Sequence, residues 1–522
     1  MIKKILVLSL ALMTLLLGFS KTELKAEDKK TKALILVNTD EEKKLFAGLI
    51  DREENFDFQI DIVSLKEKKV QSKAFAIRKF LWQIKDQYDF FVLHEDIPYG
   101  EINKGEVITD YYYAHSTDIF SHSKDNAEYF GRTVERYPEL ILSRIRNNQI
   151  DFYSKPKKRA DKINALFGLP FVCFNRNQTE CGVGNYQVDL SYTGDFFKNK
   201  FGKINPNMTF LRLYDDKSRS ILLPKSKQPR KERKKPDMYL NRENFIDNEN
   251  KKNFFLLFST YEPLAEEQRP WSYLRCFTSA LWEDKNRDQD ATELEITLME
   301  ICDYQKMNAQ NNFSFYCVPT GNKNTLISAP LIITPAFTTG EESDPAPIGY
   351  LVDDNPEGSS VSTAWNAILT DIVKGKTFSE SVLLGYTNYF KTIKEKDDYS
   401  QALNATRLTC FGLPWYTIND LIAQPQIQIK KDYYQTSEPE IIIPIRNVGD
   451  KKLVVKVEKN QYMDELLINI EPEQIYELTI KNEKSTFPLR LLRLPHKKCI
   501  PINLQTNDLK YPNVQLVVEF WE

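Results

Sequence analysis

Histidine and cysteine are the residues of this chain whose chemistry is most informative, and both are scarce. A cysteine attacks a carbonyl as the thiolate, and because a free thiol has a pKa of about 8.5 it needs a neighbouring imidazole at neutral pH. The 522-residue chain has 4 His and 7 Cys, and no histidine lies between residues 123 and 495. No two cysteines form a CxxC pair, which disfavours a zinc centre built on thiolates. The histidines are His94, His115, His122 and His496, and the cysteines are Cys173, Cys181, Cys276, Cys302, Cys317, Cys410 and Cys499.

Two of these residues occupy positions that suit chemistry. Cys317 lies near the end of an expected strand, but a buried strand cysteine is the favoured interpretation because no histidine is near it in the sequence. His94 ends another expected strand, where α/β folds place ligands. A hydrogen-bonded structural histidine is still favoured there over a catalyst. The sequence therefore predicts no catalytic residue.

Two loops carry side chains that could bind a metal ion. In the first loop two imidazoles stand among carboxylates, a set that could hold a metal, although a solvated loop is favoured. The second loop is acidic, and oxygen-rich loops can bind calcium, but without an ordered ligand spacing a solvated face is favoured. We predict no cofactor and no metal-binding residue, with calcium as the alternative left open. The first loop contains Asp110, His115, Asp118, His122 and Asp125, and the second contains Glu341, Glu342, Asp344, Asp353 and Asp354.

Three adjacent tyrosines, Tyr111 to Tyr113, stand near the start of the segment from Val107 to Pro138. Tyrosine rings are costly to leave in water, and a solvated loop has no need of three in a row. We interpret the segment as part of the scaffold of a first subdomain. Its tyrosines are expected to pack against a second one.

The amino terminus is typical of an export signal. Lys3 and Lys4 precede an apolar run from Ile5 to Phe19, and Ser20 or Ala26 would suit a cleavage point. We predict a signal peptide at residues 1–26, an uncleaved anchor being the alternative, and an exported protein that is periplasmic, on the cell surface or secreted. No later segment approaches spanning length, so no integral membrane span is expected after removal of the signal. The net charge of −2 disfavours nucleic acid as a partner.

Residues 27–155 indicate a first α/β subdomain. Short apolar runs alternate with segments of helical periodicity, the pattern of a parallel sheet with covering helices. The expected strands are 32–37, 58–65 and 88–93, and the expected helices are 40–51, 75–87 and 139–152.

Residues 156–424 indicate a second α/β subdomain. Within it Lys225 to Lys235 is strongly basic. A solvated loop is favoured for this segment, and a processing site or an anionic docking patch is the alternative. The expected strands are 170–174, 208–214, 254–259, 313–318 and 331–334, and the expected helices are 294–307, 362–374 and 379–390.

Residues 425–522 change character to short strands separated by turn residues. The segment Asn447-Val448-Gly449-Asp450 is expected to form the first hairpin. About a hundred residues of this kind favour a β-sandwich of immunoglobulin type. The predicted fold class is thus α/β, with two parallel-sheet subdomains followed by this sandwich.

Several segments together resemble the gingipain-type cysteine peptidases. Val92 to Pro98 looks like that family's strand followed by Gly-Asp and Ile-Pro, with Glu95 in place of the glycine. Thr109 to Tyr113 looks like its Ser/Thr-Asp-x-x-Tyr segment, and Gly131-Arg132 looks like its Gly-Arg-x-Pro segment without the usual proline. Gly375 to Tyr389 looks like its final helix, and Leu408 to Pro414 looks like its closing Leu-x-Gly-Asp-Pro motif, with Leu413 in place of the aspartate.

The resemblance implies a Cys–His dyad at the carboxyl edge of the second sheet, and the sequence lacks it. The family's histidine belongs in a Gly-His-Gly turn after a strand, where this chain has Thr260 to Pro263. The family's cysteine aligns with Ala336 or a neighbour, and an alanine cannot attack a carbonyl. The resemblance therefore implies a pseudo-peptidase.

Three functions remain as hypotheses. The first is a non-catalytic, gingipain-like binding or assembly component of the cell envelope, with a protein or peptide partner. The second is an active cysteine peptidase with a relocated dyad that uses Cys317 or Cys173 and a distant histidine. The third is an unrelated secreted α/β hydrolase or carbohydrate-binding protein, although no Gly-x-Ser-x-Gly elbow or nucleotide-binding loop is present.

Overall fold

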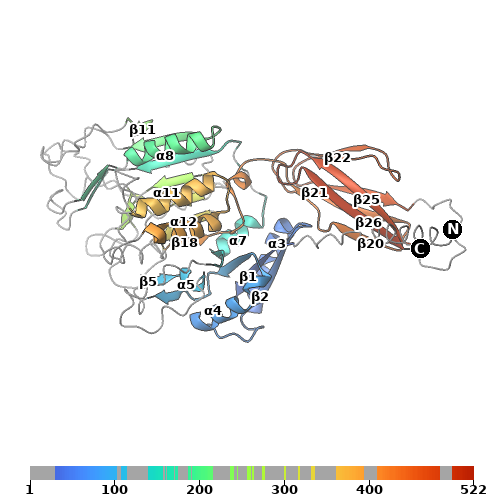
Figure 1. Ribbon diagram of the computed structural model, residues 1–522, viewed down its shortest axis with the longest axis horizontal. Helices are drawn as coiled ribbons and strands as arrows, with labels where there is room; N and C mark the ends of the chain where they lie inside the picture. The colour runs from blue at the N-terminus through green and yellow to red at the C-terminus, as the bar shows by residue number, and fades with distance from the viewer. Residues whose placement is uncertain are drawn as a thin grey trace, which may run out of the picture.

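The chain builds an α/β part and a β-rich carboxyl-terminal part, which Figure 1 shows joined end to end. The computed structural model describes residues 30–102, 107–114, 139–156, 159, 161–169, 171–174, 186–189, 191–214, 235–239, 244, 256–259, 261–263, 273–276, 299–300, 315–317, 331–335, 360–392, 408–482 and 497–521. Three segments discussed above lie outside these residues: the expected signal peptide, the acidic loop and, apart from Lys235, the basic segment Lys225 to Lys235.

The amino-terminal half of the main sheet confirms the predicted parallel arrangement. Its strands run in the order β2-β1-β3-β6, with every neighbouring pair parallel. Residues 33–37 of β1 are buried in unbroken succession because helices cover both faces of the sheet. The strands are β1 (Thr31–Val37), β2 (Phe58–Ser64), β3 (Phe90–His94) and β6 (Leu142–Ile145); the helices are α2 (Asp40–Lys43), η1 (Lys44–Phe46), α3 (Ala47–Glu53), α4 (Ala74–Gln83), η2 (Lys85–Gln87), α5 (Tyr111–Ala114) and α7 (Asn147–Tyr153).

The prediction of one helix over residues 139–152 is wrong. The first part of that segment is β6, which pairs with β3 through Phe91↔Leu142 and the positions that follow. Only the second part is helical, as α7. A short apolar run is compatible with either structure, and pairing inside the sheet satisfies the backbone groups that burial would otherwise leave without partners.

The carboxyl-terminal half of the sheet confirms several predicted elements and corrects others. The predicted strand at 170–174 exists as β8 (Phe171–Phe174), but it pairs with β9 (Tyr186–Asp189) outside the main sheet. The predicted helix at 294–307 is wrong where the structure describes it, since β15 (Met299–Glu300) pairs with β14 (Tyr273–Cys276). The strands of this half are β7 (Asn164–Leu169), β10 (Thr209–Tyr214), β11 (Met238–Tyr239), β12 (Leu256–Ser259), β16 (Phe315–Cys317), β17 (Leu331–Pro335) and β18 (Leu408–Phe411), with α8 (Ser191–Ile204), α11 (Ser360–Val373) and α12 (Phe378–Thr392).

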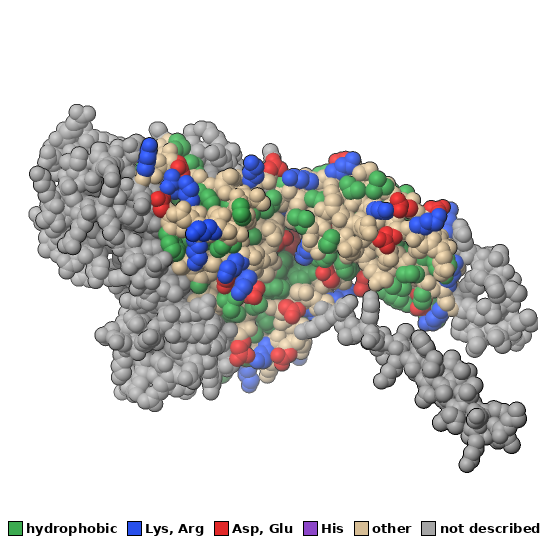
Figure 2. All heavy atoms as spheres, turned by 45° about the horizontal axis from the view of Figure 1, so that its top comes forward, with side chains coloured by type: hydrophobic (Ala, Val, Ile, Leu, Met, Phe, Trp, Pro, Cys, Tyr) green, Lys and Arg blue, Asp and Glu red, His purple; other side chains and the backbone are tan. Residues whose placement is uncertain are grey.

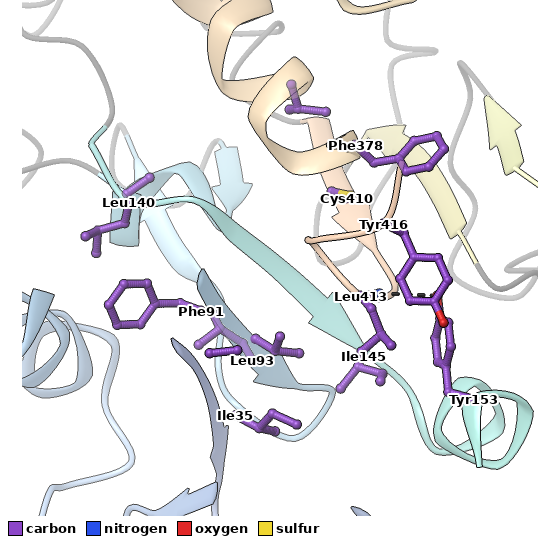
Figure 3. Close-up of a cluster of buried hydrophobic side chains, with 14 of the residues drawn as sticks. Ile35, Phe91, Leu93, Leu140, Ile145, Tyr153, Phe378, Cys410, Leu413 and Tyr416 are labelled. Atoms are coloured by element: carbon purple, nitrogen blue, oxygen red, sulfur yellow. Dashed lines mark hydrogen bonds between the residues drawn. The ribbon is translucent and has the colours of Figure 1, made fainter. Parts of the chain in front are cut away.

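The parallel sheets predicted for the two α/β subdomains form one continuous sheet. The order β11-β10-β7-β12-β16-β17-β18-β6-β3-β1-β2 is continuous, and β18 joins the halves by pairing antiparallel with β17 and parallel with β6. Figure 3 shows Leu93 of β3, Ile145 of β6 and Leu413 just after β18 in the core that results. The Leu413 N–H donates to the Tyr153 hydroxyl over 3.2 Å. A strand pairing on both sides leaves neither half with an exposed edge there.

The carboxyl-terminal part consists of two β-sheets whose buried residues form one shared core. The segment 447–450 is not a hairpin, because the strands on either side of it belong to different sheets. Asn447 holds this connection by donating to the carbonyls of Lys451 and Ile470 over 2.8 and 3.0 Å. The sheets are β19-β21-β24 and β20-β26-β25-β22-β23, formed by β19 (Ile427–Gln428), β20 (Tyr433–Thr436), β21 (Glu440–Asn447), β22 (Leu453–Val457), β23 (Leu466–Ile470), β24 (Ile475–Lys481), β25 (Lys497–Thr506) and β26 (Asn513–Trp521).

Polar contacts attach the β-rich part to the end of α3. Gln428 Nε2 donates to the carbonyls of Asp51, Arg52 and Glu54 over 2.7, 3.1 and 2.9 Å. These are the carbonyls that a helix end leaves without intrahelical partners. Arg52 in turn forms a two-pronged ion pair with Glu473 at 2.9 and 3.0 Å.

The described surface mixes both signs of charge. On the face shown in Figure 2, basic and acidic side chains are interspersed, in keeping with the net charge of −2. Within the described ranges, no helix is both long and apolar enough to cross a membrane.

Candidate functional site

His94 ends β3 at the carboxyl edge of the sheet, and its side chain is fully buried. Its Nε2 atom lies 3.1 Å from Asn147 Oδ1. Its Nδ1 atom lies 3.5 Å from Glu42 Oε2 and 3.4 Å from Asp96 Oδ2. The ends of β1, β3 and β6 are adjacent in the sheet, so residues that follow these strands converge on one ring.

Glu42 is held in place by the start of α2. Thr39 caps this helix, and its hydroxyl donates to Glu42 Oε1 over 3.1 Å. The Asn38 N–H donates to Glu42 Oε2 over 2.8 Å. This reciprocal capping arrangement satisfies helix-terminal donors, and it also fixes the carboxylate beside His94.

Asp96 belongs to a turn that the buried Arg144 holds. The Ile97 N–H donates to the His94 carbonyl over 3.0 Å and closes the turn. Arg144 Nη1 donates to the carbonyls of His94 and Ile97 over 3.1 and 2.6 Å. The guanidinium also stacks 3.7 Å from the centre of the Tyr99 ring.

The charge of Arg144 is balanced by Asp110. Nε and Nη2 of Arg144 donate to the two Asp110 oxygens over 3.0 and 2.6 Å, a two-pronged geometry. Burial opposes the charge, but the Asp110 carboxylate and the hydrogen bonds outweigh it and raise the pKa of the guanidinium. Asp110, one of the considered metal ligands, is therefore used as an ion-pair partner.

The three tyrosines are buried, as predicted, but only one faces the second half of the sheet. Tyr111 lines a small cavity with Val382 of α12 and Cys410 of β18. Tyr113 instead donates its hydroxyl to the Pro98 carbonyl, and the Arg78 guanidinium lies 4.8 Å from the Tyr112 ring centre. Burial raises the pKa of Tyr111 and Tyr113, so both hydroxyls stay protonated.

Among the described side chains, no hydrogen bond or ion pair joins a thiol to an imidazole. Cys410 is buried in β18, and burial raises the pKa of its thiol to about 12. Such a thiol is protonated at neutral pH and is a poor nucleophile. Cys499 is exposed in the β-rich part, with Sγ 3.8 Å from Glu519 Oε2.

Many of the residues considered from sequence cannot be placed. The backbones of Cys317 and Cys173 belong to β16 and β8, but their side chains are not described. Outside the described residues lie His115, Asp118, His122, Asp125, Gly131, Arg132, Ala336, Glu341, Glu342, Asp344, Asp353, Asp354 and His496.

Sequence reasoning missed Glu42, Asp96, Arg144 and Asn147. A signal was present for two of them, because Glu42 and Asp96 each follow closely on a predicted strand of a parallel sheet. Arg144 was hidden in the segment taken for a helix. Among described residues, Glu42, His94 and Asp96 form the one group of potential metal ligands, with their ligand atoms within 4.8 Å of one another.

Another acid, the partly buried Glu53, lies where the two parts of the chain meet. Glu53 accepts hydrogen bonds from the Tyr416 hydroxyl over 2.7 Å and from Trp415 Nε1 over 3.1 Å. Burial raises the pKa of Glu53, against the opposing effect of these donors and of Arg159. A cavity of about 90 Å³ adjoins these residues and also reaches Gln428. Its polar lining suits ordered water.

Comparisons with known proteins yield matches of structure alone. No family model and no curated protein matches the chain. The crystal structure of the Arg-specific cysteine proteinase gingipain R is 12% identical at a TM-score of 0.48, over 96% of this chain and 100% of that chain. A complex of the Porphyromonas gingivalis RgpB pro- and mature domains is 12% identical at 0.48, over 94% and 100%. A structure described as a protease is 10% identical at 0.45, over 94% and 97%. At these identities no match assigns a family or an activity to the chain.

Proposed function

We propose that this protein is an exported, gingipain-like pseudo-peptidase that acts as a non-catalytic binding or assembly component of the cell envelope. The observation that carries the proposal is the absence of histidine from residues 156–424. That segment supplies β7, β12, β16 and β17, and the family resemblance would place both members of the dyad at the carboxyl ends of such strands. No imidazole from this segment can activate a thiol there.

The described side chains add two supporting observations. The imidazole of His94 is buried at the end of β3 in the first half of the sheet, where Glu42, Asp96 and Asn147 are its polar neighbours. The thiol of Cys410 has its pKa raised to about 12 by burial. Neither group is suited to form a thiolate–imidazolium pair.

A binding role draws support from the β-rich part. Of the large hydrophobic side chains that are exposed among the described residues, most lie in this part of the chain. These side chains offer apolar surface that a protein or peptide partner could cover. They are Tyr433, Ile442, Leu466, Leu467, Ile475 and Leu509. An immunoglobulin-like topology for this part belongs to the same proposal.

A peptidase assay tests the loss of catalysis. Purified protein is incubated with peptides that end in arginine or lysine, with and without a thiol reductant. We expect no turnover above the buffer rate. Thiol-dependent hydrolysis that disappears in Cys317→Ala or Cys173→Ala, but persists in the control Cys410→Ala, would contradict the proposal and establish the active peptidase with a relocated dyad.

Export is tested separately by mass spectrometry of the protein's amino terminus after cell fractionation. We expect a chain that begins after Ser20 or Ala26, recovered from the periplasm, the cell surface or the medium. An intact amino terminus in the cytoplasmic fraction would contradict export.

A further inference from the structure

The Nδ1 atom of His94 is an unusual feature, because it is buried and has no hydrogen-bond partner. Its ring neighbour Nε2 faces Asn147 Oδ1, which can only accept, so Nε2 carries the hydrogen. Nδ1 itself faces two carboxylate oxygens, at 3.5 Å from Glu42 and 3.4 Å from Asp96. A cation between these three ligand atoms would offset the cost of burying them without a partner.

We propose that Glu42, His94 and Asp96 bind a divalent first-row transition cation, with Zn²⁺ as the ion that fits best. Zinc is bound by imidazole nitrogen and carboxylate oxygen at about 2.0–2.1 Å in tetrahedral geometry, which separates two ligand atoms by roughly 3.3–3.4 Å. The observed separations from Nδ1 are 3.4 Å to Asp96 and 3.5 Å to Glu42. These two separations match those across a tetrahedral ion, and all three ligand atoms lie within 4.8 Å of one another.

The surroundings are organised as the second shell of a metal site. A ligating histidine usually donates its other N–H to an oxygen that fixes the ring, and Asn147 does so here. Glu42 Oε2 is oriented by the Asn38 N–H. The turn that carries Asp96 is clamped by Arg144.

The site also has an entrance. The Asp96 side chain is 57% exposed, whereas that of His94 is 1% exposed. An ion can therefore approach from the Asp96 side. The site lies in the first half of the sheet, so it does not depend on the loss of the dyad.

Calorimetric titration of the purified full chain with ZnCl₂ tests the site. We expect one equivalent of zinc to bind, and Asp96→Asn to weaken its affinity at least about tenfold, as removal of even an outer-shell partner does. Asp96 is exposed, so this change leaves the core intact. Glu41→Gln is the matched control, because Glu41 is an exposed acid in the first turn of the same helix, and it should leave the affinity within about twofold.

A cobalt titration identifies the ligands, since seven cysteines could also bind metal. Co²⁺ at the proposed site gives d–d absorption without a thiolate-to-cobalt charge-transfer band, and Asp96→Asn diminishes that absorption. Three outcomes would overturn the proposal: no binding at millimolar zinc, equal affinity in parent and Asp96→Asn, or a thiolate band.

Discussion

Replacing Arg144 by methionine is predicted to cause a large loss of stability. Methionine keeps most of the apolar stem but removes the guanidinium, so Asp110 is left buried without its partner. Breaking a buried ion pair from one side costs about 3–5 kcal/mol. The carbonyls of His94 and Ile97 also lose a donor, which adds about 1–3 kcal/mol if they stay dry.

The loss is large compared with the about 5–15 kcal/mol by which a domain is stable. It is measured by urea denaturation, followed by tryptophan fluorescence and by far-ultraviolet circular dichroism. Because the chain has two parts and all but one of its 6 Trp precede residue 425, the fluorescence transition reports mainly on the α/β part and is the relevant one. We expect its midpoint to fall sharply or the variant to be unfolded at the start.

Two further variants isolate the ion pair. Arg146→Met is the matched control, because the Arg146 guanidinium lies over the Phe411 ring at 4.8 Å and such a contact is worth about 0.5–1 kcal/mol when partly exposed. Asp110→Asn in the Arg144→Met background removes the unpaired charge and should recover part of the loss, which defines a coupling energy. A loss below about 1 kcal/mol in Arg144→Met, or equal losses in the two arginine variants, would refute the reasoning.

Two other predictions concern the junction with the β-rich part. Burial raises the pKa of Glu53 in the folded state, so the folded chain binds this proton more tightly than the unfolded chain does. The contribution of Glu53 to the free energy of unfolding is therefore largest below its unfolded pKa of about 4.5, and it is lost as pH rises through the raised folded-state pKa. Subtracting the free energy of unfolding of Glu53→Gln from that of the parent at each pH should show this decline. A difference that stays constant with pH would contradict the prediction. Gln428→Ala leaves the carbonyls of Arg52 and Glu54 without this donor, whereas the Asp51 carbonyl keeps Lys430 Nζ at 2.6 Å. The change should cost about 1–3 kcal/mol in urea denaturation, and an unchanged midpoint would show that water replaces the amide.

Local pattern was sufficient for the elements of the first subdomain. The runs at β1, β2 and β3 are apolar, short and separated by segments of helical period, so strand type and parallel order follow from the chain itself. The prediction of a helix over residues 139–152 was wrong because a short apolar run is compatible with either a strand or a helix. Its partner on one side, β18, lies more than 250 residues away in the sequence, and no local pattern indicates such pairing.

Local pattern was also insufficient where one sheet connects to another. Asn447 to Asp450 has the composition of a hairpin turn, but β21 and β22 pair with other strands in separate sheets. Turn residues determine that the chain reverses, whereas packing of the two sheets determines which strands become neighbours. The two α/β subdomains were predicted to have separate sheets, but they share one. The reason is again tertiary pairing, because β18 pairs with a strand of each half.

What the sequence determined alone is the chemical inventory: no histidine between residues 123 and 495, and His94 at the end of a buried strand. Those facts hold in any fold and carry the pseudo-peptidase proposal. The surroundings of His94 were decided by tertiary structure, because Glu42, Asp96 and Asn147 follow three different strands that only the sheet makes adjacent. Burial then removed water from Nδ1 and left it facing two carboxylates, an environment that no residue of the sequence specifies by itself.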